Sequence, residues 1–128
     1  MSDTSLLTEE LEEILEALER IPSRFAGVEN PADFTNSLAG REHLDAICMV
    51  LMAAGEAFKK IDRRTEGRLL SRCPAIDWAG VKGMRDVIAH GYFDIDAAVV
   101  FEICRRDVPT LTDTVRVMIK EIGGEVTE

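Results

Sequence analysis

The sequence predicts an all-α protein, a bundle of four or five helices that forms one domain over residues 1–128. In the first and last parts of the chain, apolar residues recur at steps of three and four, the spacing of one helix face. No segment alternates apolar and polar residues for long enough to predict a strand. Proline or glycine stands near the places where the periodic segments stop.

The first helix is expected at the N-terminus, where a single apolar stripe runs along an otherwise acidic segment. The stripe consists of Leu7, Leu11, Ile14, Leu18 and Ile21. Pro22 lacks a backbone N–H and is expected to end this helix. A loop rich in turn-forming residues follows, in which Asn30 before Pro31 is expected to cap a short helical turn.

The second helix is expected at 41–61, and its apolar residues occupy most of its circumference. They are Leu44, Ile47, Cys48, Val50, Leu51, Met52, Ala53, Ala54 and Phe58. Such a helix is buried on more than one side, which indicates contact with the core and with a second subunit. Glu56 interrupts this apolar surface and is interpreted either as half of a structural ion pair or as a residue of a cleft.

The third helix is expected to begin at the N-cap Asp77, with Trp78 as a core anchor, and to reach His90 or Tyr92 before Gly91 helps to end it. Asp96 is expected to cap the next helix, which Pro109 interrupts or kinks. The last stripe consists of Leu111, Val115, Met118, Ile119 and Ile122.

The sequence predicts a soluble, reduced cytoplasmic protein. The longest apolar run, 46–55, is half of the ~20 residues that a membrane-spanning helix needs. The N-terminus lacks the pattern of a signal peptide, and three widely spaced cysteines predict small buried thiols rather than disulfides. Neither paired cysteines nor His-x3-His spacing indicates a metal site, and no cofactor is expected.

The net charge of −9 argues against nucleic acid as a partner, but the charge is unevenly distributed. Residues 1–20 hold seven acidic side chains and one basic one. Residues 59–72 hold six basic side chains and two acidic ones. The second segment therefore predicts either a local basic surface or an ordinary solvated helix end and loop.

Arg85, Asp86, His90 and Tyr92 form the candidate site. On a helix, Asp86 and His90 are i,i+4 neighbours, so the carboxylate is expected to orient the imidazole. Arg85 and Tyr92 project from nearly one face. A cation, an imidazole and a phenol are suited to handling a phosphate group. The residues alone also permit surface charges at 85 and 86, a helix-end histidine and a core or rim tyrosine.

Three segments resemble a known family: "AGEAFKKI" at 54–61, "PAIDWAGVKGMRDVIAHGYFDID" at 74–96 and "VVFEICRRDVPTL" at 99–111. They are similar to the HepT-like ribonuclease toxins of the HEPN superfamily. The most specific part is the Arg-x4-His-x-Tyr motif. The resemblance implies a HEPN-type helical homodimer whose motifs face each other across a cleft, encoded beside a nucleotidyltransferase antitoxin that adenylylates the tyrosine.

The resemblance implies that Arg85 and His90 are the catalytic pair of a metal-independent endoribonuclease, with Asp86 in support and Tyr92 as the adenylylation target. Asp86 departs from the Asn that is common in this branch and adds a negative charge near the scissile phosphate. Two other functions stay open: a non-catalytic HEPN subunit that scaffolds a nucleotidyltransferase, and a helical dimerisation module without a site. RNA and a nucleotidyltransferase are the expected partners.

Overall fold

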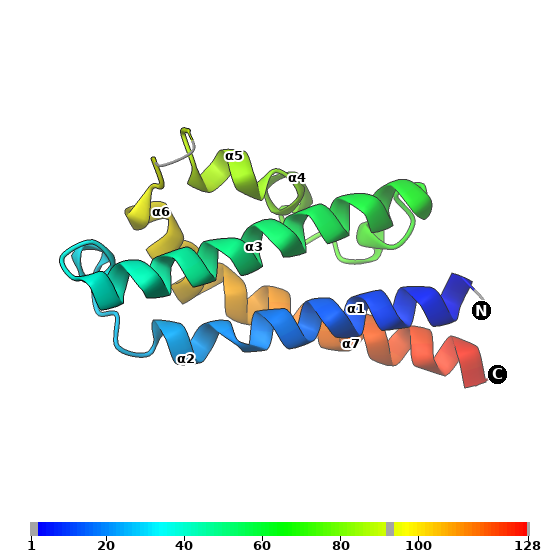
Figure 1. The fold of residues 1–128 in the computed structure, drawn as a ribbon. Helices are drawn as coiled ribbons and strands as arrows, with labels where there is room; N and C mark the ends of the chain where they lie inside the picture. Colours follow the sequence, from blue (N-terminus) through cyan, green and yellow to red (C-terminus); the bar gives the residue numbers. More distant parts are fainter. Residues whose placement is uncertain (1–2, 92–93, 128) are drawn as a thin grey trace.

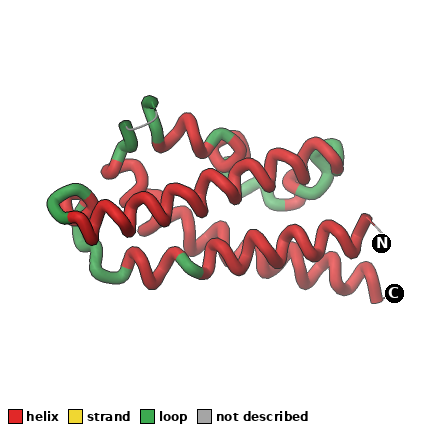
Figure 2. Tube along the Cα trace, viewed as in Figure 1, coloured by secondary structure: helices red, strands yellow, loops and turns green. Residues whose placement is uncertain are grey.

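The structure, a computed structural model, describes residues 3–91 and 94–127, with side chains described as far as residue 124. Within these ranges the chain is helical and contains no strand, as Figure 2 shows. The longer helices are α1 (Asp3–Glu19), α3 (Leu38–Arg64) and α7 (Val108–Thr127). The all-α fold expected from the sequence is confirmed.

The helices form layers on either side of α3 (Figure 1). On one side, α1 and α7 run antiparallel and pack along each other. On the other side lie α4 (Trp78–Lys82) and α5 (Met84–Ile88), which also contact α3. The short helix α6 (Ala97–Glu102) leads the chain back toward α7. The central position of α3 explains why its apolar residues cover most of its circumference.

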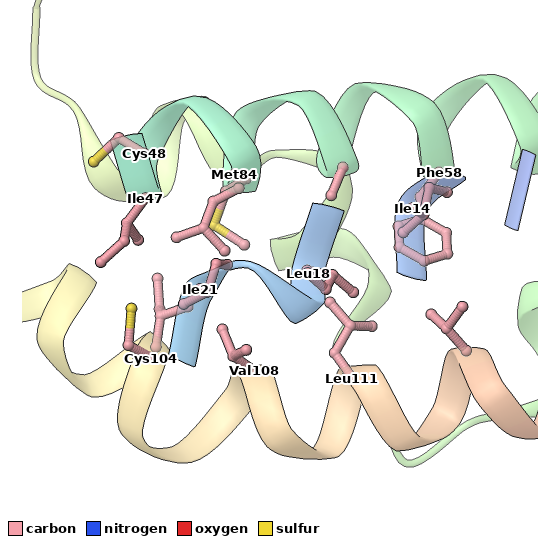
Figure 3. Close-up of a cluster of buried hydrophobic side chains, with 14 of the residues drawn as sticks. Ile14, Leu18, Ile21, Ile47, Cys48, Phe58, Met84, Cys104, Val108 and Leu111 are labelled. Carbon is pink, nitrogen blue, oxygen red and sulfur yellow. The ribbon is translucent and has the colours of Figure 1, made fainter. Parts of the chain in front are cut away.

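The predicted apolar stripes of α1 and α7 face the core. Leu11, Ile14, Leu18 and Ile21 are at most 4% exposed, and Val115, Met118 and Ile122 at most 2%. Figure 3 shows side chains of α1, α3 and α7 converging in this layer, among them Leu18, Phe58 and Leu111. Helical periodicity therefore identified the faces that form the core.

The first helix ends before Pro22 as expected, since α1 stops at Glu19. The sequence did not predict the short helix α2 (Ile21–Phe25), whose first turn contains Pro22, a position compatible with proline. The expected interruption near Pro109 is also found, although Pro109 itself lies in the first turn of α7. The interruption is the π-helical turn η3 (Ile103–Asp107), which directly precedes α7. This turn removes the clash that a proline in a regular α-helix makes with the carbonyl four residues earlier.

The other predicted caps are confirmed. Asn30 stands at the N-cap of the 3-10 turn η1 (Pro31–Phe34), where the Asp33 carboxylate accepts the Glu29 N–H at 2.8 Å. Another 3-10 turn, η2 (Leu70–Arg72), lies between α3 and α4. Asp77 Oδ1 accepts the Gly80 N–H at 3.1 Å, and Asp96 Oδ1 accepts the Val99 N–H at 3.1 Å.

Side-chain ion pairs connect the layers. Arg64 of α3 pairs with Glu10 of α1, and Arg116 of α7 reaches Glu19 of α1 at 3.0 Å. Lys82 of α4 donates to Asp62 of α3 at 2.7 Å. Arg64 of the predicted basic segment is therefore paired with a carboxylate, whereas no ion pair of Lys59, Lys60 or Arg63 is found among the described side chains; all four are exposed.

Candidate functional site

The motif segment begins on a short helix held close against α3. Gly55 of α3 makes this approach possible, because a Cβ added there would lie 2.5 Å from the Val81 carbonyl oxygen. Trp78 anchors the start of the segment, since its Nε1 donates to the Cys73 carbonyl at 2.9 Å and its ring lies 5.0 Å from that of Phe58. The prediction that Trp78 packs on the core is confirmed.

The predicted helix from Asp77 to His90 or Tyr92 was wrong. Gly83 separates α4 from α5, and α5 ends at Ile88. Glycine is a poor helix former, because its backbone loses the most conformational freedom on folding. Ala89 then adopts an extended conformation, with φ −132° and ψ 135°. His90 thus follows the helix instead of belonging to it.

The extended segment pairs with the chain that leads into α6. Ala89 forms an isolated antiparallel bridge with Ile95. The His90 N–H donates to the Asp94 carbonyl at 2.8 Å, and the Asp96 N–H donates to the Ile88 carbonyl at 2.8 Å. These bonds satisfy backbone groups that a longer helix would have paired internally. They hold His90 and Asp96 on neighbouring stretches of chain.

An open cavity of about 720 Å³ lies between α3 and the motif segment. Arg85, Asp86 and His90 line it together. On the α3 side it is lined by Asp45, Cys48, Met49 and Met52. Three of the four predicted site residues therefore share one cavity, although they do not share one helix.

The predicted orientation of His90 by Asp86 does not follow from this geometry. The i,i+4 relation requires helical backbone through Ala89, which is extended. The carboxylate found at the imidazole is that of Asp96, whose Oδ2 lies 3.8 Å from His90 Nε2. The sequence pattern identified Asp96 only as a helix cap. Its proximity to His90 depends on the reversal of the chain between them.

Tyr92 lies outside the described residues, and so does the prediction about the face from which it projects. Glu56 is exposed and does not line the cavity, and no ion pair of Glu56 is found among the described side chains. His43 is exposed and lines a different, smaller cavity. The sequence analysis treated Met52 only as an apolar helix residue and Met49 only as part of the apolar run 46–55, so neither was recognised as a cavity residue.

Among the described residues, no cluster of His, Cys, Asp and Glu side chains could hold a metal ion. None of the helices described is long and apolar enough to cross a membrane.

The comparisons with known proteins agree with this architecture. A family model described as ribonuclease HepT-like matches residues 7–118, a range that includes the cavity. A protein of Thermococcus cleftensis named "Probable ribonuclease HepT" is 32% identical over 101 residues, which cover 79% of this chain and 84% of that protein. No solved structure shows a significant match.

Two proteins of Methanocaldococcus jannaschii are also similar, "Putative RNase MJ1216" at 30% identity and "Putative RNase MJ0127" at 29%. Each match spans 99 residues, which cover 73% of this chain and 78% of the relative. The family match extends over most of the chain and agrees with the resemblance found in the motif. The chain therefore belongs to the HepT-like ribonuclease family.

Proposed function

We propose that this protein is the toxin ribonuclease of a toxin–antitoxin pair and cleaves RNA without a metal ion. The observation that carries the proposal is that Arg85 and His90 line one open cavity. A guanidinium donates paired hydrogen bonds to phosphate oxygens, and an imidazole can exchange a proton near neutral pH. The RNase names of the relatives support the same class of substrate.

The proposed reaction uses the 2′-hydroxyl of RNA as its nucleophile. One His90 imidazole takes the hydroxyl proton while the O2′–P bond forms and the P–O5′ bond breaks. An imidazolium gives its proton to the departing O5′, and Arg85 balances the negative charge that develops on the phosphorane. The products are a 2′,3′-cyclic phosphate and a 5′-hydroxyl. DNA lacks the nucleophile and is not cut.

Each chain contributes only one His90, so simultaneous acid and base catalysis favours a homodimer. One strip of α3 is suited to that contact. Its exposed residues recur at steps of three, four and seven: Glu42, Asp45, Met49, Glu56, Lys60 and Arg63. Met49 is 75% exposed, which is high for a large apolar side chain. The strip is acidic toward its N-terminal end and basic toward its C-terminal end.

This charge order is complementary to itself in an antiparallel pairing. A two-fold axis beside Met52 and Ala53 would place Glu42 against Arg63 of the partner subunit, and Asp45 against Lys60 of the partner subunit. Each contact would occur twice, as two-fold symmetry requires. Because Met49 and Met52 also line the cavity, the two cavities would adjoin this contact and form one site.

Control of the toxin is proposed to come from a nucleotidyltransferase antitoxin that adenylylates Tyr92. Tyr92 is two residues from His90 in the sequence and is the only tyrosine of the chain. A phosphate attached there would compete with RNA for Arg85. The added nucleotide would also occupy space that the substrate needs.

A second candidate is a non-catalytic subunit that scaffolds the nucleotidyltransferase. The observation in its favour is that Asp45 and Asp86 line the same cavity as Arg85. Two carboxylates weaken the attraction of a single guanidinium for RNA phosphates. RNA cleavage by the purified protein distinguishes the two candidates.

The test of the proposed function is incubation of purified protein with RNA in excess chelator. Wild type is expected to produce fragments that end in a 2′,3′-cyclic phosphate. Arg85→Ala and His90→Ala are each expected to lose about 10²-fold or more in rate, since each removes one catalytic contribution. Arg105→Ala and His43→Ala are the matched controls, because both residues are exposed and outside the cavity.

Cleavage that persists in both cavity variants would place the activity elsewhere. Absence of cleavage in wild type, combined with binding of the nucleotidyltransferase, would favour the scaffolding subunit.

A further inference from the structure

Asp96 is held in a defined position by its own backbone and side chain. Its N–H donates to the Ile88 carbonyl at 2.8 Å, and its Oδ1 accepts the Val99 N–H at 3.1 Å. The other carboxylate oxygen, Oδ2, faces His90 Nε2 at 3.8 Å. One carboxylate therefore caps α6 and faces the imidazole at the same time.

The backbone pairing explains why these two side chains meet. Ala89 lies opposite Ile95, so His90 lies opposite Asp94, and Ile88 lies opposite Asp96. Residues at positions 88 and 90 share one face of such a pair with residues 94 and 96. His90 and Asp96 are diagonal neighbours on that face, at a separation that an aromatic side chain can span.

Among the described residues, other charged side chains line the cavity with His90 but form no ion pair with its imidazole. Arg85 and Asp86 of α5 and Asp45 of α3 line the same cavity. Of the carboxylates in the described part of the chain, only that of Asp96 lies within 4.0 Å of the imidazole. The separation of 3.8 Å is longer than a hydrogen bond, as is common for catalytic contacts before substrate binds.

We infer, building on the ribonuclease function proposed above, that Asp96 is the positioning residue for His90. Its carboxylate favours the neutral imidazole with the proton on Nε2, which leaves the lone pair on Nδ1 to accept the proton of the RNA 2′-hydroxyl. When Nδ1 has taken that proton, the same carboxylate stabilises the imidazolium through Nε2–H. Asp96 touches neither RNA nor the reacting atoms.

The first test is free of RNA, so its result does not depend on the proposed cleavage. Long-range ¹H–¹⁵N correlation spectra of the imidazoles distinguish the two neutral tautomers. His90 of wild type is expected to show the Nε2–H pattern. His43, the other histidine of the chain, provides the reference in the same spectrum.

The decisive variant is Asp96→Asn, because asparagine still caps a helix but carries no charge. It is expected to fold with a helical spectrum like that of wild type, while the Nε2–H preference of His90 is lost. Asp94→Asn is the matched control, since it removes the same charge from a residue opposite His90 whose carboxylate is not at the imidazole. Its His90 spectrum is expected to match that of wild type.

The second readout is cleavage, which would be measured only after wild-type activity is found. Asp96→Asn is expected to lower kcat by about 10-fold, part of the roughly 10²–10⁴ that proton transfer contributes, with KM unchanged. An Nδ1–H pattern in wild type, or an unchanged His90 tautomer in Asp96→Asn, would overturn the inference even if RNA is cleaved. A normal tautomer result without cleavage would overturn only the proposed function.

Discussion

At the level of single residues, the three cysteines differ in how far water reaches them. Cys48 and Cys104 are buried, whereas Cys73 is half-buried. Burial raises the pKa of Cys48 to about 12, with a further contribution from the Asp45 carboxylate. Burial likewise raises the pKa of Cys104 to about 12. The prediction of buried thiols is confirmed for these two residues, while Cys73 is only partly covered.

We expect iodoacetamide to modify Cys73 well before the other two cysteines at pH 8. Only the thiolate reacts, and a pKa near 12 leaves a thiolate fraction about 10³-fold smaller than that of a thiol at the ordinary value of 9.0. Partial burial also raises the pKa of Cys73, but its thiol is less covered than the other two. Intact-mass measurement over time should show one early addition. Cys73→Ser should abolish it, and early labelling of Cys48 or Cys104 would contradict the burial of these thiols.

The same thiols predict how stability changes in alkaline solution. Their pKa values are raised in the folded state, so folding keeps their protons bound. The stabilisation is fully present below the unfolded value and is lost as pH rises from about 9 toward 12. Thermal unfolding followed across this range should show a falling Tm, and the fall should be smaller in Cys48→Ala than in wild type.

At the level of secondary-structure elements, α3 contributes to the core, to the cavity and to the proposed dimer contact. One side packs against α1, another supports α4 and α5, and Met49 and Met52 line the cavity. Its remaining strip is exposed and has acidic residues at one end and basic residues at the other. The strip from Glu42 to Arg63 is therefore the surface on which we expect a second copy to dock.

The predicted pairing between Glu42 and Arg63 of the partner subunit can be tested by charge reversal. Glu42→Arg and Arg63→Glu should each raise the dimer Kd by about 10-fold, because attraction worth roughly 0.2–1 kcal/mol per exposed pair becomes repulsion at two places. The double variant should restore the affinity. Analytical ultracentrifugation measures all four Kd values.

Glu12→Arg is the matched control, since it makes the same charge change on exposed α1 surface. A wild-type mass of 14.2 kDa at micromolar concentration would reject the homodimer. Failure of the double variant to recover would reject this register.

At the level of the whole molecule, the fold separates the acidic surface from the cavity. The acidic helix α1 packs against α7 and lies on the opposite side of α3 from α5 (Figure 1). At physiological salt, exposed charges are screened over a Debye length of about 8 Å. The net charge of −9 is therefore a weaker obstacle to RNA at the cavity than the total suggests.

At the same scale, the proposed regulation by a nucleotidyltransferase is testable by incubating the protein with that proposed partner and ATP. We expect wild type to gain the mass of adenylate at Tyr92 and to lose RNA cleavage, because the added phosphate competes for Arg85. Tyr92→Phe should escape the modification while its helical spectrum and dimer mass stay unchanged. Intact-mass measurement decides: a Tyr92→Phe protein that gains the same mass, or a modified wild type that cleaves at full rate, removes Tyr92 from the mechanism.

Sequence patterns were sufficient to predict the features that depend on neighbouring residues. Helical spacing predicts the apolar stripes of α1 and α7 and the long helix α3. Side chains next to helix ends predict the caps at Asp77 and Asp96. The motif containing Arg85 and His90 was also visible, and the family comparison agrees with it. Each of these signals depends on residues that are close together in the sequence, so it can be recognised without the tertiary structure.

The tertiary structure was needed to identify which side chains lie beside His90. Helical spacing assigned Asp86 to His90, but Ala89 is extended and Asp96 is the carboxylate at the imidazole. The reason is that the Ala89 N–H is the last one to pair with the carbonyl four residues earlier, whereas the His90 N–H pairs with the Asp94 carbonyl of a neighbouring segment. Met49 joins the cavity for a similar reason, since the packing of α5 on α3 places it there.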